Sequence, residues 1–306
     1  MAFRLPTTED LSAAGYLAGW KLIGKLPQSW VAALFNWGAD QVSKDGAGMD
    51  MLRRNLTRVV GAHNVTRDLV RASVRSYARY WREAFRLPRL AGDPDLIAKI
   101  SEGTVGRELL DESLARGKGV ILTLPHSGNW DMAGMWLHTH YGQFTTVAER
   151  VKPAVLFDAF VDFRESLGFE VLALTGSATP PFQRLKDVLE AGGIVCLLGE
   201  RDLTARGVPV SFFGETTTMP AGPAQLAIET GAALHAVHCW FTGTDSDPGW
   251  GLSASAPIEV TSLEETTQRV ADLFAANIAA HPEDWHMLQP QWPVDKKQRR
   301  TSNVGE

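Results

Sequence analysis

The chain has 306 residues, 44% of them apolar, and a formal net charge of −5. This length and composition predict one large globular domain and exclude a fibrous or intrinsically disordered chain. No stretch reaches the roughly 20 apolar residues that span a bilayer, because Lys21, Lys25 and Pro27 interrupt the most apolar candidate. The N-terminus also lacks the pattern of a secretory signal. We therefore expect a cytoplasmic protein whose contact with a membrane is peripheral.

The N-terminal third of the chain is predicted to be helical. Residues 9–43 carry many apolar and aromatic side chains, and helical patterning resumes over residues 50–86 and again over 94–116. Within the second of these segments Arg67, Arg71, Arg75 and Arg79 are spaced by four, so they form one stripe along a helix. A solvated helix face is the simplest reading of this stripe. Contact with the anionic head groups of a membrane is the reading we favour.

From Gly119 onward the segments alternate between strand and helix patterns. This alternation predicts an α/β fold with a central, mostly parallel sheet flanked by helices. The predicted strands are 119–125, 144–148, 169–174, 194–199, 233–242 and 251–260, and the predicted helices are 129–141, 153–167, 180–191, 221–231 and 263–280. Residues 208–213 are expected to form a loop. We expect a single domain over residues 1–306, with a membrane-contacting helical part over 1–118, the α/β core over 119–292 and a basic tail over 293–306.

The most informative motif follows the first predicted strand. His126 and Asp131 lie five positions apart at a strand-to-helix turn, together with Gly128 and Asn129. Alone, His126 could be a core or capping residue, and Asp131 could be a carboxylate that favours the start of a helix. Because all four residues fall at one strand end, the motif favours a general base, His126, oriented by Asp131. Deprotonation of a hydroxyl is the expected task.

Two further strand ends carry polar residues. Glu149 follows the strand over 144–148, and Glu200 and Arg201 follow the strand over 194–199. Because ligands bind beyond the carboxyl ends of parallel strands, we expect these residues at the same edge as His126. A solvated loop with a local ion pair is the alternative for residues 200–202. Arg164, on a mostly apolar predicted helix, could bind an anion or pair with Glu165 or Glu149, and both readings stay open.

Metal and serine-hydrolase chemistry receive no support from the sequence. His138 and His140 are two positions apart on a predicted helix, so they point to different sides. No Gly-x-Ser-x-Gly motif occurs, and Ser127 is only a weak candidate nucleophile. No nucleic-acid-binding motif accompanies the arginine stripe. We expect neither a metal ion nor a nucleic acid as a partner.

The ordered motifs resemble those of the glycerophospholipid-type acyltransferase superfamily, whose signature is a histidine followed by four residues and an aspartate. Within it the chain is most similar to the lauroyl/myristoyl lipid A acyltransferase group. The matching blocks are His126 to Asp131, Glu149-Arg150 through Arg164 and Gly168, Gly199 to Asp202, Val208 to Gly214 through Ala221 to Ala224, and His281 to Trp285 ending at Trp292. Two departures are a missing N-terminal membrane span and Glu200-Arg201 where Asp-Gln is usual.

Both departures resemble a peripheral branch of this group that transfers a fatty acyl chain from acyl-coenzyme A to a mannose hydroxyl of a mannosylated phospholipid. The resemblance implies acyl-coenzyme A as co-substrate, no bound cofactor, a palmitoyl chain, and a location on the cytoplasmic face of the membrane. His126 would act as general base without an acyl-enzyme. The resemblance implies substrate-binding roles for Asn129, Glu149, Arg164, Glu200 and Arg201.

Other functions remain open at this stage. Within the family, a lipid A-type or lysophospholipid acyltransferase is the alternative. From other classes, a thioesterase or lipid hydrolase would use His126 and Asp131 to activate water, and a lipid-binding module would have no turnover. The apolar helices over 129–141 and 153–167 could line a tunnel for a fatty chain, although an apolar helix face is more often core.

Overall fold

The structure is a computed structural model that describes residues 19, 22–150, 154–176, 180–204 and 206–295. The helical pattern expected before residue 22 and the basic residues of the expected tail, which begin at Lys296, lie outside the described residues.

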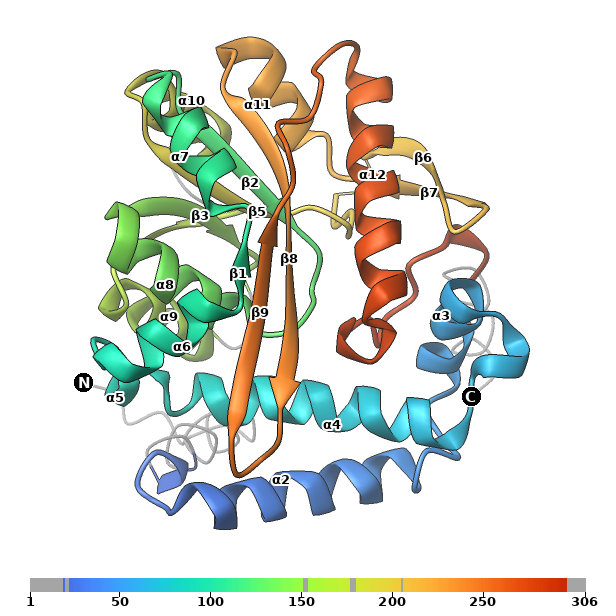
Figure 1. The fold of residues 1–306 in the computed structure, drawn as a ribbon. Coiled ribbons are helices and arrows are strands. Elements are labelled where there is room, and N and C mark those ends of the chain that lie inside the picture. The colour runs from blue at the N-terminus through green and yellow to red at the C-terminus, as the bar shows by residue number, and fades with distance from the viewer. Residues whose placement is uncertain (1–18, 20–21, 151–153, 177–179, 205, 296–306) are drawn as a thin grey trace, which may run out of the picture.

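A seven-stranded sheet forms the centre of the described structure (Figure 1), with the strand order β1-β9-β8-β2-β5-β3-β4. Its strands are β1 (Thr104–Val105), β2 (Val120–Leu124), β3 (Phe144–Ala148), β4 (Phe169–Ala173), β5 (Ile194–Leu198), β8 (Ala233–Gly243) and β9 (Pro248–Ala254). Neighbouring strands pair in parallel except β8 and β9, which form an antiparallel pair. The predicted α/β class is confirmed.

Helices cover both faces of this sheet. The helices after β1 are α7 (Arg107–Ala115), α8 (Trp130–Tyr141), α9 (Ala154–Ser166), α10 (Pro181–Glu190), α11 (Gly222–Thr230) and α12 (Leu263–Ala280). One apolar core joins the sheet to α7, α8 and α9, and a second joins its other face to α10, α11 and α12. The second core also holds Trp285 and Trp292, both fully buried. Strands buried on both faces explain why β2 reads as a continuous apolar run.

The N-terminal part is helical, as predicted, but more divided. It contains α2 (Gln28–Ser43), α3 (Asp50–Val60), α4 (Arg67–Ala84), α5 (Leu87–Leu90) and α6 (Pro94–Glu102), with a short η1 (Ala62–Asn64). The predicted helix over 50–86 is broken after α3 because Gly61 adopts φ 79°. The predicted helix over 94–116 is likewise wrong, since β1 separates α6 from α7 and Gly106 adopts φ 81°.

Residues 208–212 form a strand and not part of the predicted loop. β6 (Val208–Phe212) pairs with β7 (Glu215–Met219) as an antiparallel hairpin. Phe213 and Gly214 both have positive φ, at 51° and 77°, as a tight two-residue turn of this kind requires. A phenylalanine at such a position is uncommon, so the turn is hard to recognise from the sequence.

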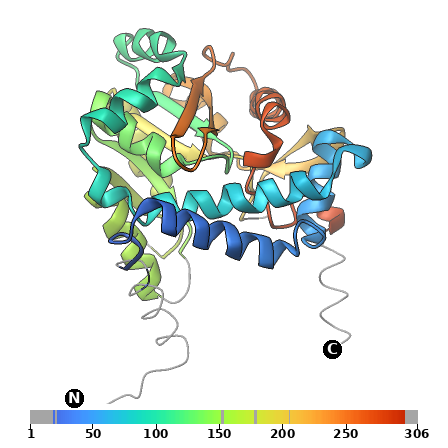
Figure 2. The ribbon, with the colours of Figure 1, turned by 60° about the horizontal axis from the view of Figure 1, so that its bottom comes forward.

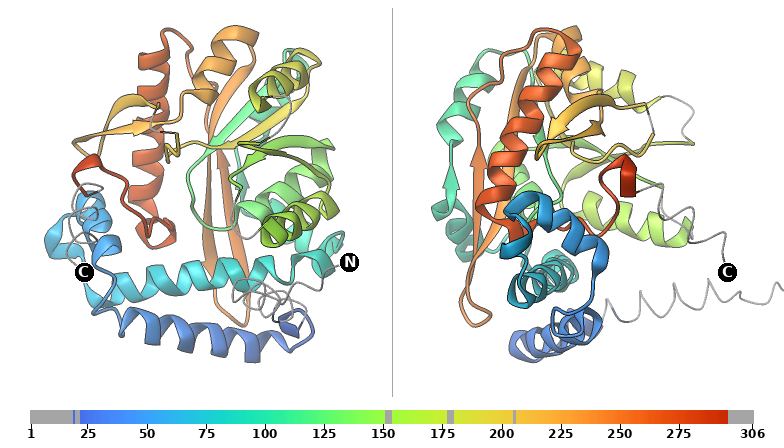
Figure 3. Two further views of the ribbon diagram at one scale, coloured as in Figure 1. Left: turned by 180° about the vertical axis from the view of Figure 1, so that it is seen from behind. Right: turned by 90° about the vertical axis from the view of Figure 1, so that its right-hand side faces the viewer.

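Two arginines of the α4 stripe contact other elements of the protein. The Arg75 Nε donates to Asp40 of α2 at 2.7 Å, and the Arg79 Nε donates to Glu83 at 2.7 Å. Arg79 also donates to the carbonyl of Gly249 on β9 at 2.9 Å. Figures 1 and 3 show α4 lying between α2 and the end of the sheet. Two guanidinium groups of the stripe therefore hold α4 to its neighbours, and contact of the stripe with a lipid surface stays a prediction.

Candidate functional site

The register of the parallel strands brings His126 and Glu200 together. β2 and β5 are neighbours, and Leu124 at the end of β2 pairs with Leu198 at the end of β5. His126 and Glu200 each lie two residues beyond these ends, as the sequence predicted for a shared edge. One carboxylate oxygen, Glu200 Oε1, lies 2.8 Å from the backbone nitrogen of His126 and 2.6 Å from its Nδ1.

This contact fixes the protonation pattern of the imidazole. A carboxylate oxygen that accepts from the backbone N–H and from Nδ1 requires a proton on Nδ1. Nε2 is then the basic nitrogen. Glu200 is fully buried, whereas the His126 side chain is 28% exposed. A substrate can therefore approach His126, which carries the basic nitrogen. The side-chain amide of Gln291 donates to the backbone carbonyl of Glu200 at 2.6 Å and so holds the turn after β5 in place.

The turn that carries His126 is held by the segment after α12. Ser127 and Trp285 form an antiparallel bridge, flanked by bonds from His286 N to His126 O (2.8 Å) and from Gly128 N to Asp284 O (3.0 Å). Gly128 has φ 56°, and a Cβ there would lie 2.6 Å from the carbonyl carbon of Cys239. Ser127 is fully buried, and its Oγ has no partner among the described residues, so it has no base to activate it as a nucleophile.

Asp131 is placed differently from the expectation. Its carboxylate accepts from Arg164 Nε at 2.7 Å and from the Tyr80 hydroxyl at 2.8 Å. It is 2% exposed at the first turn of α8. Burial raises the pKa of Tyr80 well above its usual range, and the Asp131 carboxylate raises the pKa of Arg164 although burial alone would lower it. The carboxylate that holds the imidazole is thus Glu200 and not Asp131.

The same contact gives Arg164 an ion-pair partner. Its partner is Asp131, 33 residues earlier in the chain, and not Glu165 or Glu149. Its guanidinium is committed to a buried ion pair, which is a structural use of the charge. Arg164 also lines the apolar cavity, so its binding of an anionic substrate group stays a prediction.

Asn129 also has a structural place. Its Oδ1 accepts from the Met132 N–H and caps α8, and its Nδ2 donates to Glu83 of α4 at 2.9 Å. Both ends of the amide are therefore occupied by the protein, and Asn129 is 2% exposed. The predicted substrate-binding role of Asn129 is not supported by these contacts. Glu83, which also accepts from Trp250 Nε1 at 2.8 Å, links the turn to the N-terminal helices.

Glu149 and Arg201 lie at the carboxyl edge of the sheet, as expected. Glu149 follows β3 and is exposed, and Arg201 follows Glu200 and is partly exposed. In the described part of the chain, neither side chain has a hydrogen bond or an ion pair. Both are therefore available to a ligand that approaches this edge.

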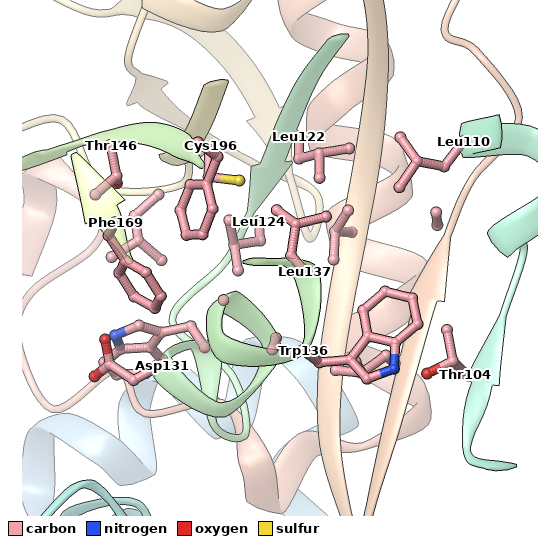
Figure 4. Close-up of a pocket in the computed structure, with 18 of the residues that line it drawn as sticks. Thr104, Leu110, Leu122, Leu124, Asp131, Trp136, Leu137, Thr146, Phe169 and Cys196 are labelled. Carbon is pink, nitrogen blue, oxygen red and sulfur yellow. The ribbon is translucent and has the colours of Figure 1, made fainter. Parts of the chain in front are cut away.

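An apolar cavity of about 890 Å³, its open mouth included, lies between α8 and the sheet. Leu124, Leu198 and Trp130 line it, and the Trp130 ring lies 5.4 Å from the ring of His126. Figure 4 shows Asp131 towards one end and Thr104 and Leu110 towards the other. Side chains of α8 line this cavity, whereas among the described α9 residues only Arg164 does. A tunnel for a fatty chain stays a prediction.

Sequence reasoning missed the residues that α4 and the segment after α12 bring to this edge. Ser76 and Tyr80 lie on α4, and Asp284 and His286 come from residues 282–286. Asp284 belongs to the fifth matching block of the sequence. Its place in that block was the one feature that could have indicated a functional role. Ser76 and Tyr80 sit within a helix pattern that gives no functional signal, and His286 lies between the quoted residues Trp285 and Trp292 of that block.

Among the residues that the structure describes, no helix is both long enough and apolar enough to cross a bilayer.

The site has an imidazole that is hydrogen-bonded to a buried carboxylate. It lies at the carboxyl end of a parallel sheet, beside an apolar cavity. This arrangement is suited to acyl transfer onto a hydroxyl. The family model for bacterial lipid A biosynthesis acyltransferases matches residues 6–293, and the chain belongs to this family. It is 50% identical to a phosphatidylinositol mannoside acyltransferase of Mycolicibacterium smegmatis, over 99% of this chain and 98% of the relative. It is 49% identical to the enzyme of the same name from Mycobacterium tuberculosis, over 98% of this chain and 95% of the relative.

Proposed function

We propose that the protein transfers a palmitoyl chain from acyl-coenzyme A to a mannose hydroxyl of a phosphatidylinositol mannoside. The observation that carries the chemistry is the His126–Glu200 pair beside the apolar cavity. The names of the two relatives and the high identity across both full lengths support the acceptor. The lining of the cavity is mostly apolar, which suits an acyl chain.

The chemical step follows from the orientation of the imidazole. Nε2 of His126 takes the proton of the acceptor hydroxyl while the oxygen attacks the thioester carbonyl carbon. Glu200 stabilises the imidazolium that forms, as the acid of a catalytic triad does. Collapse of the tetrahedral intermediate breaks the C–S bond, and the departing sulfur takes the proton back from Nε2. The products are an ester and free coenzyme A, with no acyl-enzyme.

The charged residues at the sheet edge fit the polar parts of the substrates. Arg201 has no ion-pair partner among the described residues and follows Glu200 directly, so it suits a phosphate of the donor or of the lipid acceptor. Glu149 is exposed on the neighbouring strand end and suits the hydroxyl groups of a sugar. Neither role requires a metal ion.

The reaction is tested by incubating the protein with palmitoyl-coenzyme A and each of three acceptors, followed by mass analysis of the products. The acceptors are a phosphatidylinositol mannoside, a lipid A precursor and a lysophospholipid. We expect an ester of the mannoside and release of coenzyme A. Acylation of either other acceptor in its place would contradict the proposed substrate. Hydrolysis that outpaces transfer with the mannoside present would indicate a thioesterase.

We propose peripheral attachment to the membrane through the outer face of α2. Val31, Ala32 and Ala39 of α2 are buried, whereas Trp30, Leu34 and Trp37 are 69%, 52% and 63% exposed. Their spacing places these three side chains on one face of the helix. Figure 2 shows α2 at the outside of the molecule, beside α4. Tryptophan and leucine on an exposed helix face favour the boundary between head groups and acyl chains.

Vesicle sedimentation of the double variant Trp30→Ser/Trp37→Ser tests this attachment. Burial of two large apolar side chains contributes several kcal/mol, so we expect the variant to bind about 100-fold more weakly. Ile228→Ser, on α11 at the opposite end of the molecule in Figure 1, is the control and should bind as the wild type does. Equal binding of both variants would contradict attachment through α2.

A further inference from the structure

A second histidine lies directly opposite His126. The bridge between Ser127 and Trp285 is antiparallel, and the flanking bonds place His126 across from His286. Residues opposite each other in such a pair point to the same face, and their chain neighbours point to the other face. Ser127 and Trp285 are fully buried, the His126 side chain is 28% exposed, and His286 is buried with 8% of its surface exposed. The pairing therefore places His286 on the same side of the bridge as His126.

The surroundings of His286 are aromatic. The Trp130 ring, which contacts His126, lies 6.0 Å from the His286 ring, and the Tyr77 ring lies 5.2 Å from it. Burial, together with the nearby His126, lowers the pKa of His286 to about 3. The ring is therefore neutral at any pH at which the enzyme works, and it offers one nitrogen with a proton and one without.

A buried network decides which nitrogen of His286 carries the proton. Asp284 accepts from the Phe241 N–H at 2.8 Å and from the Ser76 hydroxyl at 2.6 Å. Burial raises the pKa of Asp284 to about 6, so above that pH it is ionised and takes the single proton of Ser76. The Ser76 oxygen, 2.9 Å from Nε2 of His286, then accepts from a proton on Nε2. Nδ1 is left as an acceptor; it is buried and has no partner among the described residues.

We propose that Nδ1 of His286 accepts a hydrogen bond from a second hydroxyl of the acceptor sugar, next to the hydroxyl that His126 deprotonates. The reacting hydroxyl has one proton, and His126 takes it, so the proton for Nδ1 comes from another hydroxyl. This selects a polyol over a simple alcohol as acceptor. Ser76 and Asp284 are positioning residues that keep the accepting nitrogen free. The inference rests on the proposed transfer to a mannoside.

A matched pair of variants separates the two nitrogens of His286. The amide of His286→Gln reaches the position of Nε2 and keeps the contact with Ser76, whereas that of His286→Asn reaches the position of Nδ1. We expect His286→Gln to lower kcat/KM for the mannoside by about 10- to 100-fold, as loss of one buried hydrogen bond implies. Hydrolysis of palmitoyl-coenzyme A without acceptor should stay within about twofold, and His286→Asn should retain transfer within about fivefold.

His235→Gln is the control for the loss of a buried histidine. His235 is fully buried and bonded to Ser113 and to the Ser255 carbonyl, away from the transfer site. We expect it to lower thermal stability without changing the ratio of transfer to hydrolysis. If His286→Gln leaves this ratio unchanged as well, His286 is structural and the inference is wrong. The proposed function fails separately, if wild-type protein forms no acylated mannoside.

Asp284→Asn tests the network. The amide keeps the bond from Phe241 but donates to Ser76, which turns the Ser76 proton towards Nε2 of His286 and moves the ring proton to Nδ1. We expect transfer to fall about as far as in His286→Gln, with hydrolysis again retained. Transfer at the wild-type level in Asp284→Asn, measured at pH 7.5 where Asp284 is ionised, would overturn the assigned tautomer and with it the inference.

Discussion

Replacing His126 by alanine lowers kcat for palmitoyl transfer by about 10²- to 10⁴-fold, the range that a general base contributes. The variant keeps the apolar cavity, so KM for palmitoyl-coenzyme A should change little. His63→Ala, an exposed histidine in η1, is the matched control and should retain full activity. Steady-state release of coenzyme A measures both constants. Near-normal turnover in His126→Ala would contradict the mechanism.

Glu200 is expected to matter through the charge that it offers to His126. In Glu200→Gln the shape is kept, but the imidazolium that forms during transfer loses a fully buried carboxylate at 2.6 Å. Hydrogen bonds to charged groups contribute about 1.5–3 kcal/mol, so we expect kcat to fall about 10- to 150-fold. A kcat above half the wild-type value would show that Glu200 only holds the turn in place.

Arg164→Met should be the most destabilising single change near the site. It leaves the Asp131 carboxylate, 2% exposed, with a partner only in Tyr80. Removing one member of a buried ion pair costs about 3–5 kcal/mol, because the other charge stays buried and unpaired. Urea denaturation of the variant should show a loss of this size in the free energy of unfolding.

The double variant Arg164→Met/Asp131→Asn completes this test. With both charges removed, most of the lost stability should return, since a buried pair and its neutral replacement are often similar in stability. The kcat of this double variant should also stay well above that of Glu200→Gln. The reason is that the Asp131 carboxylate contacts Arg164 and Tyr80, whereas Glu200 contacts the imidazole. If the restored protein is as inactive as His126→Ala, Asp131 acts on the imidazole during the reaction, as the sequence motif had suggested.

Much of the α/β core could be predicted from local patterns. β2 and β5 are short apolar runs that end in polar residues, and α8 begins at the predicted turn. The hairpin of β6 and β7 was missed because its turn depends on a phenylalanine with positive φ. The arginine stripe of α4 was correctly placed on one helix face. The pattern of one helix does not reveal that Arg75 contacts α2 and that Arg79 contacts the β8–β9 hairpin.

That His126 and Glu200 lie at the same edge of a parallel sheet could be predicted from the sequence, since strand and helix patterns are local properties of the chain. Which carboxylate contacts the imidazole depends on how distant segments pack in three dimensions. Asp131 is five residues from His126, yet its contacts are with Arg164 and Tyr80, whereas Glu200 reaches Nδ1 from 74 residues away. The physical reason is that the pairing of β2 with β5 aligns the two turns, whereas the first turn of α8 directs Asp131 towards α4 and α9. His286 was hidden for the same reason, because its place opposite His126 exists only once residues 284–286 pair with the turn.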